Sequence, residues 1–148
     1  MTIRPMERAD IPAVAEIEKA CFSSPWSEES LASSLSSGHT AFFLAEEDGV
    51  AAGYIGTQLL PPEGDILNLA VRSEYRRRRI GRKLLDAALE HFRLNGVKAV
   101  VLEVRASNMA AQRLYASAGF QPVGIRRGFY AGPPEDAVLM RALLEPAL

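Results

Sequence analysis

Two segments in which an apolar strand leads into a helix constrain the fold of this chain more than any other feature. Residues 65–72 form an apolar run, and a helix with one apolar face is predicted from Ile80 until Asn95-Gly96. Residues 98–104 form a second, β-branched run, followed by a helix that Asn108 caps and Gly119 ends. Strand–helix units of this kind place helices on the faces of a sheet.

The remaining elements extend that sheet on both sides. Asp10 is predicted to cap a helix that ends near Cys21, and Ser27 to begin a short second helix. Asp48-Gly49 predicts a hairpin between strands 41–46 and 50–60. Further strands are predicted over residues 2–6, 120–126 and 137–143, the last two around a Gly-Pro-Pro loop. The order of these elements predicts one three-layer α/β domain, residues 1–148, with a mixed sheet and helices on its faces.

Charge and composition exclude several classes of function. Seventeen basic and eighteen acidic residues leave a net charge of −1, which argues against bulk attraction to nucleic acid or to an anionic membrane. The longest stretch without charge, residues 30–45, is rich in serine, so we expect no membrane anchor and a cytoplasmic protein. Cys21 is the only cysteine and the two histidines are isolated, so zinc, other metal and redox sites are not expected.

The segment 75–83 is the first candidate for chemistry. It holds six basic residues where a strand turns into a helix, and Gly81 lets the backbone come close to a bound group. The unpaired amides of a helix N-terminus favour an anion, so this segment predicts a phosphate-binding site, with a solvated basic loop as the alternative. Because the glycine patterns of nucleotide-binding loops are absent, a compact phosphorylated cofactor fits better than nucleoside triphosphates or nucleic acid.

Glu103 and Tyr115 are the second and third candidates. Glu103 lies within an apolar strand, where burial would raise its pKa toward the range of a general base. An ion pair with Arg105 or Arg72, or an edge position that faces water, is the structural alternative. Tyr115 taken alone is typical of core packing, but the preceding turn should bring its helix back beside the strand of Glu103. The two side chains would then share a cleft as base and acid.

Together these residues resemble the GNAT superfamily of acyl-CoA-dependent N-acyltransferases. The family signature Gln/Arg-x-x-Gly-x-Gly/Ala aligns with Arg76–Gly81, although Arg79 stands where the family has its first glycine. The resemblance spans nearly the whole chain and is closest to bacterial enzymes that acetylate the N-terminal alanine of a small-subunit ribosomal protein, numbered eighteen. The other segments that carry it are Pro25–Glu28, Asn68–Val71, Leu102–Asn108, Leu114-Tyr115, Gly119-Phe120, and Ile125–Arg127 with Tyr130.

The resemblance implies a fold, a co-substrate and a set of site residues. It implies the three-layer GNAT fold, whose mixed sheet is mostly antiparallel, and acetyl-CoA as co-substrate without a metal. Glu103 would be the general base and Tyr115 the general acid of a direct transfer, and Asn108 would contact the pantetheine. The backbone of Leu69, Ala70 and Val71 would pair with the pantetheine arm and polarise the thioester. The pyrophosphate would lie against Arg77, Arg78, Arg79, Ile80, Gly81 and Arg82.

The resemblance implies an N-terminal peptide as the acceptor. An N-terminal peptide needs a groove, and segments 22–26 and 128–135 are its expected walls, although their aromatic residues could equally be ordinary packing. A GNAT enzyme for a small amine or a lysine side chain, a non-catalytic acyl-CoA-sensing module, and nucleic-acid binding through the arginine loop remain alternatives. Cys21 as a nucleophile is a further alternative, for which a buried structural thiol is the favoured explanation.

Overall fold

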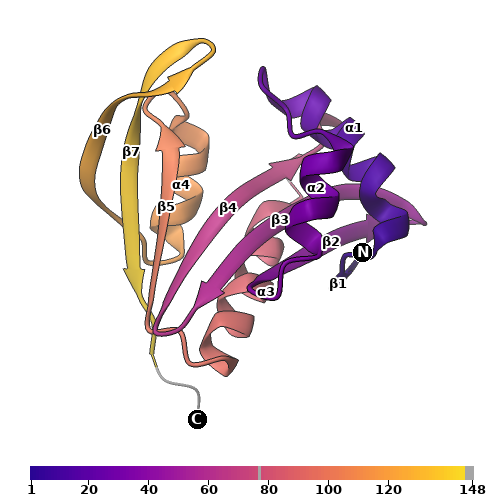
Figure 1. Cartoon of the computed structure of the whole chain (residues 1–148), viewed down its shortest axis with the longest axis horizontal. Coiled ribbons are helices and arrows are strands. Elements are labelled where there is room, and N and C mark those ends of the chain that lie inside the picture. The colour runs from indigo at the N-terminus through magenta and orange to yellow at the C-terminus, as the bar shows by residue number, and fades with distance from the viewer. Residues whose placement is uncertain (77, 146–148) are drawn as a thin grey trace.

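A computed structural model describes residues 1–76 and 78–145 and shows one seven-stranded sheet between two layers of helices (Figure 1). The strands lie in the order β1-β2-β3-β4-β5-β7-β6, and only β4 and β5 pair in parallel. The strands are β1 (Thr2–Pro5), β2 (Thr40–Glu47), β3 (Val50–Leu60), β4 (Glu63–Val71), β5 (Ala99–Arg105), β6 (Gln121–Ala131) and β7 (Pro134–Leu143). The helices are α1 (Ile11–Cys21), α2 (Glu28–Leu35), α3 (Ile80–Leu94) and α4 (Met109–Ser117). The predicted three-layer fold and element order are confirmed.

Each face of the sheet carries its own core. Tyr54 and Ile55 are neighbours on β3, and their side chains point to opposite faces of the sheet. Both are fully buried because each face is covered. Tyr54 packs with α1 and α2, and Ile55 packs with α3. None of the helices in the described ranges is long and apolar enough to cross a membrane.

The sheet opens between β4 and β5. Their parallel pairing covers Glu63–Asp65 against Ala99–Val101, after which the two strands diverge (Figure 1). The Phe92 ring of α3 packs where a Cβ of Gly64 would stand, so a side chain at Gly64 would push this junction apart. Beyond Asp65, β4 stays paired with β3 on one side only, within the part of the chain that the structure describes. The divergence therefore leaves a free backbone edge in the middle of the sheet.

The start of α1 differs from the prediction. Asp10 does not cap this helix through its side chain, because a 3-10 turn over Arg8–Asp10 already gives it helical dihedral angles. Its carboxylate instead accepts two hydrogen bonds of 2.8 Å from the Arg4 guanidinium and one of 2.8 Å from the Glu7 amide. The hydrogen bonds from Arg4 lower the pKa of Asp10. Asp10 thus ties β1 to the first helix of the chain.

The closing hairpin is longer than predicted. Strands β6 and β7 continue past residues 126 and 137, so that the connection is the short Gly132-Pro133 turn and not a loop over 128–135. The pairing of β6 with β7 shifts register between Arg126 and Tyr130, so the strand continues through residues 127–129. Gly128 takes a φ of 62° there, and its amide donates to the Asp136 carboxylate over 2.8 Å. Gly128, the first residue of the segment 128–135, therefore lies at a bulge within a strand.

Arg79 has a left-handed backbone at the start of α3. Its φ and ψ are 60° and 20°, which places an arginine where the family signature has glycine. A residue with a Cβ in this region costs about 1–2 kcal/mol, and glycine does not have that cost. The sequence departure therefore stores strain next to the predicted phosphate site.

Replacing Arg79 by glycine should stabilise the fold. We expect Arg79→Gly to raise the free energy of unfolding by about 0.5 kcal/mol, because relief of the left-handed strain exceeds the added freedom of the unfolded chain. Urea unfolding measures this change. Arg78→Gly is the matched control, since it removes the same charge where φ is not positive, and it should destabilise. An equal loss of stability in both variants would contradict the strain at Arg79.

Candidate active site

The free edge of β4 is the centre of the candidate site. Leu69, Ala70 and Val71 pair with β3 through one edge of their backbone. Their other edge faces the divergence from β5, where the described residues provide no strand partner. An extended ligand with amide groups can hydrogen-bond to such an edge as another strand would. The Val71 carbonyl already accepts from the Arg76 guanidinium over 3.2 Å, so the geometry is suited to the expected pantetheine contacts through the other backbone groups of this stretch.

The N-terminus of α3 follows this edge directly. The amide of Lys83 donates to the Arg79 carbonyl over 3.0 Å and is the first intrahelical donor. The amides of Ile80, Gly81 and Arg82 precede it and have no partner within the helix, so they form a site for an anion. A Cβ on Gly81 would lie 3.3 Å from Leu114 of α4, so glycine permits the close approach of the two helices.

The side chains of the basic segment have unequal roles. Arg82 is engaged by Asp86 at 2.9 Å and by the Ser117 carbonyl and hydroxyl of α4, both at 2.9 Å, which leaves its backbone amide for a ligand. Ile80 is buried in the core and likewise offers only its backbone. Arg78 is exposed, with its guanidinium 5.4 Å from the Tyr75 ring centre. Arg77, also predicted to hold the pyrophosphate, lies outside the described residues.

Asn108 caps α4 as predicted. Its Oδ1 accepts a hydrogen bond of 3.1 Å from the Ala111 amide. Its Nδ2 makes no hydrogen bond with the described residues, so this amide group can donate to a ligand. The capping bond fixes the direction of that donor.

Glu103 lies on the open face of the second half of the sheet. Leu102 and Val104 point into the core beneath α3 and α4, so the side chain between them points the other way. Its side chain is 30% exposed, and its carboxylate lies 3.7 Å from the Arg126 guanidinium. The partner is thus on β6, and the predicted alternatives of Arg105 and Arg72 are wrong. Arg105 pairs with Glu135, and Arg72 donates to the Ala51 carbonyl.

Tyr115 lies in the core on the inner face of α4. Its ring packs edge-on against Phe120 at 5.7 Å, and burial raises the pKa of its phenol, with Tyr130 nearby adding to the rise. Burial also raises the pKa of Tyr130. The positive charge of Arg105 lowers this pKa, and the negative charge of Glu103 raises it. Glu103 and Tyr115 form no hydrogen bond with each other. Tyr115 packs in the core that holds Leu102 and Val104, on the face of β5 away from the Glu103 side chain.

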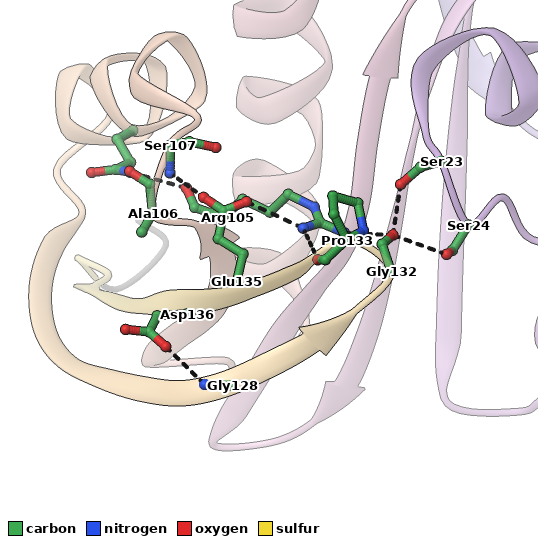
Figure 2. A network of polar contacts seen from close by, with 11 residues as sticks. Ser23, Ser24, Arg105, Ala106, Ser107, Gly128, Gly132, Pro133, Glu135 and Asp136 are labelled. Atoms are coloured by element: carbon green, nitrogen blue, oxygen red, sulfur yellow. Dashed lines mark hydrogen bonds and ion pairs between the residues drawn. The ribbon is translucent and has the colours of Figure 1, made fainter.

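A polar network fastens the tip of the β6–β7 hairpin beside this region (Figure 2). Arg105 donates to the Pro133 carbonyl over 3.0 Å and to Glu135 over 3.2 Å. The other oxygen of Glu135 accepts from the Ser107 amide over 2.6 Å, and the Ser107 contact is the main cause of a lowered pKa at Glu135. The Arg105 guanidinium also stacks 4.2 Å above the Tyr130 ring. The hairpin is thus held at the C-terminal end of β5.

The same turn also contacts the segment between α1 and α2. Ser23 donates its hydroxyl hydrogen to the Gly132 carbonyl over 2.8 Å, and Ser24 over 3.4 Å (Figure 2). The two segments predicted to wall the acceptor groove therefore meet. Of their aromatic residues, Phe22 and Trp26 pack against the core under α1 and α2, and Phe129 packs against Tyr130 at 5.0 Å.

Two residues of this region have a setting that sequence reasoning did not anticipate. Cys21 is half-buried rather than buried, and its thiol donates to the Val71 carbonyl over 3.5 Å. Glu18 lies on the apolar face of α1 and is fully buried. Its carboxylate accepts a hydrogen bond from the side-chain amide of Asn68, next to the free edge of β4. The sequence signal for Glu18 is its position, because it is an acidic residue on the face of α1 that is otherwise apolar. No group of three metal-ligating side chains occurs among the described residues.

Comparison with known proteins decides the family. The model of the Acetyltransferase (GNAT) family matches residues 11–120. The chain belongs to the GNAT acetyltransferase family. GNAT enzymes use acetyl-CoA, and the β4 edge and α3 N-terminus described above fit its pantetheine and phosphate groups. In the crystal structure of the Escherichia coli ribosomal-protein-S18-alanine N-acetyltransferase, 96% of that chain superposes on 99% of this GNAT chain, with a TM-score of 0.91 and 36% identity.

Named relatives are similar over nearly their whole length. The Escherichia coli ribosomal protein bS18-alanine N-acetyltransferase is 38% identical over 141 residues, which cover 94% of this GNAT chain and 95% of the relative. The N-alpha-acetyltransferase RimI of Mycobacterium tuberculosis is 40% identical over 147 residues, which cover 95% of this chain and 91% of the relative. The chain is therefore an acyltransferase of this family, and its relatives include enzymes for protein N-termini.

Proposed function

We propose that this protein is an N-alpha-acetyltransferase that transfers the acetyl group of acetyl-CoA to the N-terminal alanine of ribosomal protein bS18. The observation that supports the transfer is the free β4 edge, which runs directly into the N-terminus of α3. The acceptor rests on the activity named for its relatives. Such an enzyme works in the cytoplasm, where ribosomal proteins are made.

Glu103 is the proposed general base. An α-amine has a pKa of about 7.7–8.0, so much of it is protonated at neutral pH and must lose a proton before it attacks. Glu103 takes that proton, directly or through a water. The amine nitrogen then bonds to the acetyl carbonyl carbon, and amides of Leu69–Val71 stabilise the oxyanion. Arg126 forms an ion pair with Glu103 over 3.7 Å, and this contact orients the carboxylate until the acceptor arrives.

Tyr115 is the proposed general acid. When the carbon–sulfur bond breaks, the departing thiolate of coenzyme A needs a proton. Burial raises the pKa of the Tyr115 phenol, which keeps it protonated at neutral pH and ready to donate. The amide product keeps the new carbon–nitrogen bond, and coenzyme A leaves as a thiol. No covalent enzyme intermediate is needed, which leaves Cys21 without a role as nucleophile.

The acceptor is tested by offering a panel of amines to the purified protein with acetyl-CoA. We expect an N-terminal peptide of bS18 to gain one acetyl group on its alanine by mass spectrometry, with release of one thiol. The same peptide with a blocked terminus is the control. Polyamines, aminoglycosides and a lysine-containing blocked peptide should release thiol at least tenfold more slowly. Preferential turnover of a small amine would refute the acceptor, and binding without turnover would indicate an acyl-CoA sensor.

Removing either proposed proton-transfer group should slow the reaction. We expect Glu103→Gln and Tyr115→Phe each to lower kcat about 10²-fold, with acetyl-CoA affinity within about threefold, because neither side chain is needed to hold the cofactor. Thiol release measures kcat, and calorimetry measures affinity. Glu63→Gln, exposed at the start of β4, is the matched control and should retain its rate. Unchanged rates in the first two variants would refute their roles.

A further inference from the structure

Glu18 is a fully buried acid that the proposed mechanism does not use. It lies on the face of α1 that packs against the sheet, and its exposed fraction is 0%. No Lys, Arg or His of the described chain forms an ion pair with it. Its carboxylate accepts three hydrogen bonds, from the Trp26 amide at 2.9 Å, the Tyr54 hydroxyl at 2.8 Å and the Asn68 side-chain amide at 2.9 Å. Burial raises the pKa of Glu18, while its donors favour the ionised form.

The three donors belong to three different parts of the candidate site. Trp26 lies between α1 and α2, in the segment whose Ser23 and Ser24 contact the β6–β7 hairpin. Tyr54 belongs to β3, the strand that supports β4. Asn68 directly precedes Leu69–Val71, the part of the free β4 edge that is expected to hold the pantetheine. One carboxylate thus connects the acceptor side of the site with the cofactor side.

Asn68 also lies at an irregular position of β4. The pairing with β3 shifts register between Gly56↔Asn68 and Thr57↔Ile66, which leaves Leu67 as an extra residue. A bulge of this kind bends a strand and changes the direction of the backbone after it. The hydrogen bond from Asn68 to Glu18 fixes the strand at the point where Leu69–Val71 begins.

Stability alone gives no reason for a carboxylate at this position. Burying a charge without a cation is costly, and apolar side chains of similar volume fill such a space at lower free energy. The core between α1, α2 and this face of the sheet is apolar, with Val14 and Leu31 among its members. A carboxylate can instead orient its neighbours, because it accepts from several donors at once and hydrogen bonds to a charged acceptor are strong.

We propose that Glu18 is a positioning residue for acyl transfer, which holds the β4 bulge through Asn68 and the acceptor segment through the Trp26 amide. This inference rests on the proposed transfer reaction and goes beyond it, since it concerns a residue remote from the reacting atoms. Amides that stabilise an oxyanion must be aligned before the reaction. Loss of the carboxylate should therefore reduce kcat more than it weakens acetyl-CoA binding.

The variant Glu18→Gln tests this directly. Its amide keeps the size of the side chain but has only one accepting atom, whereas one oxygen of Glu18 accepts from Trp26 and the other from both Tyr54 and Asn68. Either the Trp26 contact is lost, or the Tyr54 hydroxyl and the Asn68 amide must turn round to accept, which changes how Asn68 holds the strand. We expect kcat to fall about tenfold or more with the KM for acetyl-CoA within threefold, measured by thiol release with the best acceptor of the amine panel. Trp26 is the only tryptophan, so its emission should also change when its amide loses the carboxylate.

Two further variants separate positioning from folding. Leu31→Ala removes a fully buried side chain of α2 and should lower stability while kcat stays within threefold. The double variant Glu18→Gln with Asn68→Asp exchanges donor and acceptor, so that the new amide can donate to the new carboxylate and still accept from Trp26. This double variant should recover kcat to within about threefold of the wild type.

The outcomes distinguish this inference from the function on which it rests. An unchanged kcat in Glu18→Gln, an equal loss in Leu31→Ala, or no recovery in the double variant would overturn the role of Glu18 while leaving the transfer activity in place. Wild-type protein that releases no thiol with any amine would overturn the proposed function and this inference together.

Discussion

The early end of the pairing between β4 and β5 is the constraint on which the rest of the structure depends. Three residues of each strand pair, and the strands then separate. In a continuous sheet the backbone of Leu69–Val71 would be occupied on both edges. Because the sheet is open here, that backbone can hydrogen-bond to a ligand instead. The amides at the start of α3 continue the same surface, so one stretch of chain provides both a strand edge and an anion site.

An open sheet needs other contacts to keep its halves in place. The Gly132 carbonyl, near the end of the second half, accepts from Ser23 between α1 and α2, and Arg105 holds the same turn against β5. On the first half, Glu18 connects α1, β3 and β4 through side-chain hydrogen bonds. These contacts lie at the two sides of the divergence. They let the middle of the sheet remain unpaired without leaving its two halves free to move.

Much of the fold could be predicted because its signals are local. The Asp48-Gly49 turn has φ values of 50° and 78°, as a tight hairpin requires, and Ser27 caps α2 through the Ser30 amide. The local sequence predicts that Asp10 caps α1, but the Arg4 side chain binds its carboxylate instead. The prediction of a loop over 128–135 is wrong because β6 continues through this segment, with a register shift between Arg126 and Tyr130 that no local signal indicates.

The candidate site was less predictable because its geometry depends on register between distant segments. Nothing near Glu103 in sequence indicates Arg126, which is brought beside it by the order of β5, β7 and β6. The family signature located the α3 N-terminus, yet only the backbone shows that Arg79 takes the left-handed conformation. Glu18 was visible as an acid on an apolar face, but its three donors come from elements that only the folded sheet assembles.

The central claim is that acetyl-CoA binds to the free β4 edge and the α3 N-terminus. Nuclear magnetic resonance titration of ¹⁵N-labelled protein with acetyl-CoA tests it most directly. The amide signals of Leu69–Val71 and Ile80–Arg82 should shift strongly, while those of Val123 and Ile125 on the exposed outer strand stay in place. Saturable binding that leaves the signals of Leu69–Val71 unmoved would contradict the account.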